Sequence, residues 1–271
     1  MSTKGVYTAL SGAIAQSQRL DTIANNMANI NTPSFKKDQQ VFQEYLTANE
    51  KPAEVIQAPR IPASVESFYD MQGGDKSFVD AAGTYTNFSQ GSLKNTGNPM
   101  DVAIDGNGFF EIATPQGVKL SRLGAFKLDG NGQLVTKDGY PLLKMAPEGT
   151  DPASRTFKVS GQAQVTITDS GDVLDGLTNL GKVSLVDVAA KDALVKEGGS
   201  LYGFKKNFKA EVTNVKSPAL KQGFIEGSNV NIVQEMTDMI ATTRLFESTQ
   251  KAINAYDSMA DKLINVVGSV K

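Results

Sequence analysis

The sequence predicts an α+β protein, with N- and C-terminal helices that form a coiled-coil-like pair and a central antiparallel β-rich domain. Three observations predict this fold class. In both end segments, apolar residues recur at alternating spacings of three and four, which places them on one face of a helix. Between the ends, short apolar runs alternate with glycine-containing turns, as in an antiparallel sheet. No apolar stretch approaches the roughly 18 residues of a membrane-spanning helix, so no membrane span is expected.

The first element is a predicted helix over residues 6–28, and Pro33 ends it because the residue before a proline disfavours helical backbone. Four asparagines crowd the end of this helix, although asparagine is a poor residue for a helix interior. Two interpretations stay open: the asparagines simply end the helix, or their side-chain amides bond the backbone of neighbouring copies. The stripe consists of Val6, Leu10, Ala13, Ser17, Leu20, Ala24 and Met27, and the asparagines are Asn25, Asn26, Asn29 and Asn31.

The last element is a longer predicted helix over residues 232–267, with Asn231 as its candidate N-terminal cap. Its apolar stripe is wide, which indicates more than one packing partner. The shorter first helix cannot cover this stripe alone, so we expect both helices to become ordered when neighbouring copies cover them. The stripe follows Ile232, Met236, Met239, Thr243, Phe246, Gln250, Ile253, Asp257, Ala260, Ile264 and Val267.

Strands and turns are predicted between the two helices. Asp105-Gly-Asn-Gly108 and Asp129-Gly-Asn-Gly132 both separate apolar runs, which favours hairpin turns. Neither has the oxygen spacing of a calcium loop, and Glu111 stands where a dinucleotide fingerprint has its third glycine. We predict three parts: residues 1–33 with 228–271 as a terminal helical assembly domain, 34–75 with 201–227 as an extended connecting region, and 76–200 as a β-rich outer domain.

Composition excludes several classes of function. The chain has 27 Lys and Arg against 29 Asp and Glu, so nucleic acid is not expected as a partner. It has no histidine and no cysteine, which removes imidazole and thiolate metal sites and the common nucleophile systems. We therefore expect no enzyme activity and no cofactor or metal. Among carboxylates that could form an acid–base pair, solvated turn residues are the favoured interpretation; these are Asp101, Asp105, Glu111 and Asp129.

Three regions resemble, in order, the signatures of bacterial flagellar rod and hook proteins. The N-terminal one is Ala24-Asn-Asn-Met-Ala-Asn-Ile-Asn-Thr-Pro-Ser-Phe-Lys36. The middle region contains Asp101-Val-Ala-Ile-Asp-Gly-Asn-Gly-Phe-Phe110 and Arg122-Leu-Gly-Ala-Phe126, and the C-terminal region contains Glu226-Gly-Ser-Asn-Val-Asn-Ile-Val233 and Glu235-Met-Thr-Asp-Met-Ile240. The family usually has glycine immediately before Phe-Lys, where this chain has Ser34.

The resemblance implies a structural subunit of the basal-body rod that polymerises into a helical tube and transmits torque from motor to hook. It implies terminal helices interleaved in an inner core and β domains that face outward. The implied partners are other copies, adjacent rod proteins and the flagellar type III export apparatus. The implied location is the periplasmic rod, reached without a cleaved signal peptide.

Within the family, the sequence favours the proximal rod over the distal rod. A stand-alone binding or adhesion module with a helical stalk is the alternative outside the family. The residues expected at the assembly interface are Val6, Leu10, Ala13, Leu20, Ala24, Asn25, Asn26, Met27, Asn29, Asn31, Asn229, Asn231, Ile232, Met236, Met239, Ile240, Arg244, Phe246, Ile253 and Ile264.

Overall fold

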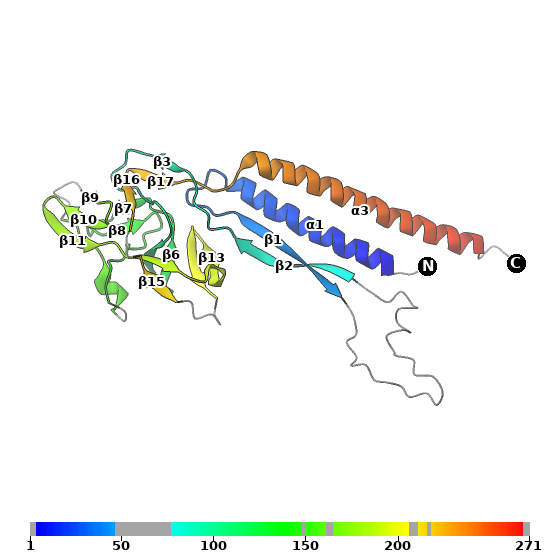
Figure 1. Cartoon of the computed structure of the whole chain (residues 1–271), viewed down its shortest axis with the longest axis horizontal. Coiled ribbons are helices and arrows are strands. Elements are labelled where there is room, and N and C mark those ends of the chain that lie inside the picture. The colour runs from blue at the N-terminus through cyan, green and yellow to red at the C-terminus, as the bar shows by residue number, and fades with distance from the viewer. Residues whose placement is uncertain are drawn as a thin grey trace, which may run out of the picture. The chain divides into compact units, whose positions relative to one another are not determined.

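Helices lie at the two ends of the chain and strands lie between them (Figure 1). The computed structural model describes residues 4–46, 77–147, 150–160, 165–205, 211–215 and 218–267. The α+β class that the sequence predicts is confirmed. The chain divides into two compact units: unit 1 comprises Met1–Asn26, Asp38–Tyr85 and Ile232–Lys271, and unit 2 comprises Met27–Lys37 and Thr86–Asn231.

Unit 1 contains the two helices and a ribbon of two strands. Helix α1 spans Lys4–Ala28 and helix α3 spans Ile232–Val267, and the bounds of α3 are those that the apolar stripe predicts. Strands β1 (Asp38–Leu46) and β2 (Ser77–Thr86) form a two-stranded sheet. Residues 47–75 of the predicted connecting region, and residue 76 of the predicted outer domain, lie outside the described residues. Within the described ranges, no helix is long and apolar enough to cross a membrane.

Between Thr86 and Asn231, the regular elements of unit 2 that the structure describes are short strands and two 3₁₀ turns. The strands are β3 (Leu93–Asn95), β4 (Val102–Ile104), β5 (Phe109–Thr114), β6 (Gly117–Ser121), β7 (Phe126–Leu128), β8 (Leu134–Thr136), β9 (Val165–Ile167), β10 (Asp172–Asp175), β11 (Thr178–Lys182), β12 (Leu185–Val188), β13 (Leu194–Gly198), β14 (Leu201–Phe204), β15 (Val212–Asn214), β16 (Leu220–Gln222) and β17 (Phe224–Glu226). The 3₁₀ turns are η1 (Pro152–Arg155) and η2 (Lys191–Ala193).

The largest sheet of unit 2 has six strands in the order β13-β14-β6-β5-β12-β15. A three-stranded sheet has the order β11-β10-β9, and the remaining strands pair as β16-β4, β17-β3 and β7-β8. The pairings within unit 2 are antiparallel, as predicted.

Strand β5 lies at the centre of the hydrophobic core and is buried on both faces. Because side chains alternate along a strand, Phe109 packs into one cluster with Tyr202, while Phe110 and Ile112 pack into a larger cluster on the other side. The Phe109 and Tyr202 rings meet edge to face with their centroids 5.8 Å apart. The sheet is therefore a core layer that both clusters share.

The two Asp-Gly-Asn-Gly segments have different structures. The segment at 129–132 joins β7 to β8 as the predicted hairpin turn, and Asp129 accepts hydrogen bonds from the amides of Asn131 and Gln133. The hairpin prediction for residues 105–108 is wrong. This segment joins β4 to β5, and β4 pairs instead with β16, whose Leu220 faces Ile104. Local turn chemistry cannot reveal that partner, because it lies more than 100 residues further along the chain.

Candidate functional site

The predicted stripe of α1 divides into a buried part and an exposed part. Ala13 is buried, and Val6, Leu20 and Met27 are half-buried, whereas Leu10 and Ala24 are exposed. Two large residues outside the predicted stripe, Tyr7 and Ile14, are 59% and 53% exposed. Since Tyr7, Leu10 and Ile14 are spaced three and four apart, they share one face of the helix. This apolar face lies open in the single chain.

Helix α3 presents a second open apolar face. Met239, Phe246 and Ile253 are half-buried, whereas Asn231 before the helix and Arg244 within it are exposed. Over the first turns the exposed apolar side chains are Ile232 (46%), Val233 (69%), Met236 (48%) and Ile240 (54%). Their spacing gathers them within about a third of the helix circumference. The side chain of Ile264 lies outside those that the structure describes.

Asn26 joins three elements of unit 1. Its Nδ2 donates to the backbone oxygen of Asp38 at 2.9 Å, and its Oδ1 accepts from the Asp38 amide at 2.9 Å. The same Nδ2 donates to Oε2 of Glu235 at 3.3 Å. Asn26 and Glu235 are 1% and 2% exposed. The end of α1, the start of β1 and the first turn of α3 therefore meet at one buried amide.

The other asparagines around the end of α1 have different surroundings. Asn25 and Asn31 are exposed, and Asn29 is half-buried. The Thr32 hydroxyl donates to Oδ1 of Asn29 at 3.1 Å, and the Ile30 amide donates to the Met27 oxygen as the helix ends. The local bond of Asn29 is the kind that ends a helix.

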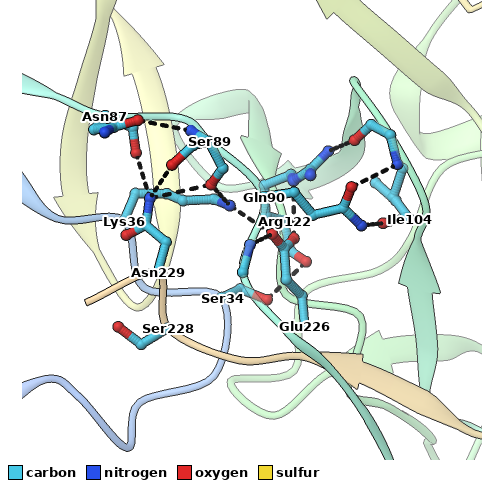
Figure 2. A network of polar contacts seen from close by, with 12 residues as sticks. Ser34, Lys36, Asn87, Ser89, Gln90, Ile104, Arg122, Glu226, Ser228 and Asn229 are labelled. Carbon is cyan, nitrogen blue, oxygen red and sulfur yellow. Dashed lines mark hydrogen bonds and ion pairs between the residues drawn. The ribbon is translucent and has the colours of Figure 1, made fainter. Parts of the chain in front are cut away.

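A buried group of charged residues lies in unit 2 and was not among the predicted site residues (Figure 2). Lys36 Nζ lies 2.5 Å from Oε1 of Glu226, and Arg122 Nε lies 3.0 Å from Oε2 of the same carboxylate. The three side chains are 0%, 1% and 4% exposed, respectively for Lys36, Glu226 and Arg122. One carboxylate thus joins two cations in the interior, and we call these three residues the ion triad.

Backbone groups complete the hydrogen bonding of the ion triad. Lys36 Nζ also donates to the Ser89 oxygen at 2.8 Å, and the Gly91 amide donates to Oε1 of Glu226 at 2.8 Å. Arg122 Nη1 donates to the carbonyl oxygens of Gly106 and Gly108. The Asp-Gly-Asn-Gly segment at 105–108 therefore supplies acceptors for a buried guanidinium. Such satisfied bonding is what makes buried charge tolerable in a protein interior.

Ser34 fixes the approach of the N-terminal segment to the ion triad. Its amide donates to the Glu226 oxygen at 2.8 Å, and its hydroxyl donates to the Arg122 oxygen at 2.9 Å. The residue is fully buried and its φ is 57°, a left-handed conformation that favours glycine. Glycine would adopt this conformation without strain, which fits the glycine that the family resemblance implies at this position.

Burial lowers the pKa of the Lys36 ammonium below its ordinary value of 10.5, although the Glu226 carboxylate beside it acts in the opposite direction. Arg122 adds to the lowering because it is a second nearby positive charge. The net direction shows that removal from water outweighs the attraction of the shared carboxylate.

The four carboxylates considered for acid–base chemistry each have a separate partner. Asp101 accepts hydrogen bonds from Thr96 and Asn98, and Asp129 accepts one from the Gln133 amide within its own turn. Asp105 forms an ion pair with Lys221, and Glu111 forms one with Arg155. Across the described part of the chain, no group of three His, Cys, Asp or Glu residues could hold a metal ion.

The predicted site residue Asn229 lies next to the ion triad. Its Oδ1 accepts from the Lys37 amide at 2.8 Å, and its Nδ2 donates to the Asn87 oxygen at 2.8 Å. The charged residues of the ion triad were missed because a charged side chain is expected at the surface by default. A signal did exist: each one belongs to a different signature segment, beginning or ending at Lys36, Arg122 and Glu226.

These features define a class: structural proteins with open apolar helical faces and a β-rich body. Three family models match in order along the chain. Residues 6–36 match "Flagella basal body rod protein", residues 103–175 match "Flagellar hook protein FlgE/F/G D1 domain", and residues 221–266 match "Flagellar basal body rod FlgEFG protein C-terminal".

Named relatives match over nearly the whole chain. The flagellar basal-body rod protein FlgG of Bacillus subtilis (strain 168) is 34% identical, over 97% of this chain and 98% of the relative. FlgG of Agrobacterium fabrum (strain C58) is 33% identical, over 95% and 97%. The flagellar basal-body rod protein FlgF of Mesorhizobium japonicum is 32% identical, over 97% and 98%. The chain therefore belongs to the flagellar basal-body rod protein family, whose members are structural proteins and not enzymes.

Proposed function

We propose that copies of this rod-family chain polymerise through their terminal helices into a helical tube that transmits torque from motor to hook. The observation that carries the proposal is the pair of open apolar faces on α1 and α3, in a chain related along its length to rod proteins. Family membership favours this role over a stand-alone binding or adhesion module.

Within one subunit, α1 and α3 form a coiled-coil-like pair that the buried Asn26–Glu235 contact supports. The open faces then meet neighbouring copies. Covering a large apolar side chain contributes about 1.5–3 kcal/mol, so a few such residues per helix give a strong drive to assemble. The interface that we propose is the set of stripe residues and asparagines predicted from the sequence. Asn26 and Asn229 act in it by positioning backbone, since their amides bond their own chain.

The proposed partners are other copies, adjacent rod proteins and the flagellar type III export apparatus, and the proposed location is the periplasmic rod of the basal body. We propose that export needs no cleaved signal peptide. The division into a helical assembly domain, a connecting region and an outer β domain remains our prediction.

We propose a place in the proximal rod, on the sequence features that favour it. The identities of 34% to a FlgG protein and 32% to a FlgF protein do not separate the two places. Site-specific crosslinking in assembled basal bodies tests the choice. Crosslinks to distal-rod copies on both sides of the subunit would place the chain in the distal rod instead.

The experiment for polymerisation compares the full chain with a Met236→Ser, Ile240→Ser double variant. Ser248→Ala is the control, because Ser248 is an exposed residue of α3 outside the apolar face. Sedimentation and far-UV circular dichroism are measured over a concentration series. We expect the full chain and the control to gain helix as they associate, and the double variant to stay monomeric with unit 2 unchanged. A double variant that associates like the full chain contradicts the proposal.

A further inference from the structure

We propose that Asn229 is a positioning residue that gathers three segments at the boundary of unit 2, so that these segments move as one joint. The chain passes between the two units after residues 26, 37, 85 and 231. Lys37, Asn87 and Asn229 belong to unit 2 and lie within three residues of three of these passages. The proposal concerns the contacts among these three residues and rests on the proposed function in the rod.

The side-chain amide of Asn229 bonds both other segments, and Figure 2 shows its bonds to Asn87 and Ser89. Its oxygen accepts from the Lys37 amide at 2.8 Å. Its nitrogen donates to the Asn87 oxygen at 2.8 Å, and to the Ser89 oxygen and hydroxyl at 3.1 Å each. An asparagine amide carries an acceptor and two donors on one rigid plane, as a peptide group does. Asn229 therefore joins segments that are 140 or more residues away along the chain.

Direct backbone bonds complete the same triangle. The Asn87 amide donates to the Lys37 oxygen at 2.9 Å, and the Asn229 amide donates to the Phe35 oxygen at 3.3 Å. Two residues of the ion triad are close in sequence to this contact: Lys36 precedes Lys37 by one residue, and Glu226 precedes Asn229 by three. The ion triad and the Asn229 contacts are therefore neighbours along two segments of the chain. The ion triad compensates buried charge. The Asn229 amide sets the relative position of the segments, because its acceptor bonds the Lys37 segment and its donors bond the Asn87 segment.

A joint of this kind has a mechanical consequence. When hydrogen bonds connect the three segments, a force applied to unit 2 is distributed over all of them. Without these hydrogen bonds, the shortest of the three segments bears the force first. A subunit that transmits torque needs the first behaviour, so Asn229 is the residue whose loss matters under load.

The first test is amide hydrogen exchange followed residue by residue by NMR in the full chain. Asn229→Ala is expected to raise exchange at least tenfold at Lys37 and at Asn87 and Ser89 together, and to leave β5 within twofold of the parent. Asn229→Asp keeps an oxygen for the Lys37 amide but loses the donors to the Asn87 and Ser89 oxygens. The segment of Asn87 and Ser89 is then held less firmly, so exchange of the Asn87 and Ser89 amides is expected to rise while that of Lys37 does not. Asn179→Ala is the matched control, because Asn179 Oδ1 accepts only a local bond from Gly181 in the contacts described.

Two outcomes would overturn the proposal that Asn229 holds the three segments together. One is unchanged exchange at Lys37 and Asn87 in Asn229→Ala. The other is a uniform rise that includes β5, because the residue would then act only on global stability. If Asn229→Ala does not fold, the same comparison is made with Asn229→Asp, which retains one of the two directions.

The second test is swimming of cells that lack the chain and carry each variant, in dilute and in viscous medium. Asn229→Ala is expected to lose at least twice as much speed as Asn179→Ala when viscosity rises. Equal losses overturn the load-sharing role while the proposed function stands. Failure of the parent chain to restore swimming at all is a different result, and it refutes the proposed function.

Discussion

Replacing Glu226 with glutamine should unfold unit 2 at a much lower denaturant concentration. Glutamine keeps the shape of the side chain but removes the charge that Lys36 and Arg122 share. One of its two terminal atoms becomes an NH₂ group, so it meets either the Arg122 guanidinium or the Lys36 ammonium as donor against donor. At least one charged hydrogen bond is lost, and two cations remain buried without the carboxylate.

The expected loss of unfolding free energy is large because the ion triad is buried from solvent. Breaking a buried ion pair by removing one partner costs about 3–5 kcal/mol, mostly because the remaining charge is uncompensated. The side chains of the ion triad are at most 4% exposed, so water screens little of this cost. The free energy of unfolding of a whole domain is about 5–15 kcal/mol, so the variant should lose a large share of it.

The assay is urea unfolding followed by near-UV circular dichroism, for which the buried Tyr202 is a reporter in unit 2. Glu197→Gln is the matched control, because Glu197 pairs with Lys119 at 2.8 Å but is 34% exposed. An exposed pair of this kind contributes about 0.2–1 kcal/mol. A Glu226→Gln cost below about 1 kcal/mol, or one equal to that of the control, would refute the reasoning from burial.

Three further predictions follow from the same unit. Ser34→Ala keeps the strained left-handed backbone and loses the hydroxyl hydrogen bond, so it should lower the free energy of unfolding by about 1–3 kcal/mol. Ser34→Gly loses the same bond but removes the backbone strain, so its effect should be closer to neutral, and thermal melts compare the two variants. Gly124→Ala should destabilise by at least about 1–3 kcal/mol, because its Cβ would lie 1.7 Å from the Val102 oxygen; a melting midpoint within a degree of the parent contradicts this. Since the pKa of Lys36 is lower in the folded chain than 10.5, the unfolded chain binds more protons between the folded pKa and 10.5. Relative to Lys36→Met, the free energy of unfolding should therefore rise with pH across that window, and urea titrations from pH 7 to 11 measure the difference.

The sequence predicts those parts of the fold that depend on short-range patterns. The bounds of α3 follow from a periodic stripe that begins at Ile232 and continues to Val267. The hairpin around residues 129–132 follows from its own turn residues. The same turn sequence at 105–108 failed as a guide, because the partner of β4 is chosen by non-local packing of Leu220 into the core.

The ion triad was beyond prediction for a related reason. Lys36 and Glu226 are separated by 190 residues, and nothing local to either one indicates burial. The role of the Gly106 and Gly108 carbonyls depends on Arg122, which lies on a different element. The family signature contains the segments that carry these residues, but the sequence pattern indicates no role for Lys36, Arg122 or Glu226 themselves.

The pairing of β3 with β17 and of β4 with β16 brings the beginning and the end of the main stretch of unit 2 together. A chain with this layout behaves as a closed module, whose interior can be lengthened without separating its ends. Leu177, at the turn between β10 and β11, is fully exposed and far along the chain from both closing pairs. A folded guest domain grafted at this turn should leave the closure intact, which makes the turn a natural place to display a tag or an epitope on the body of the subunit.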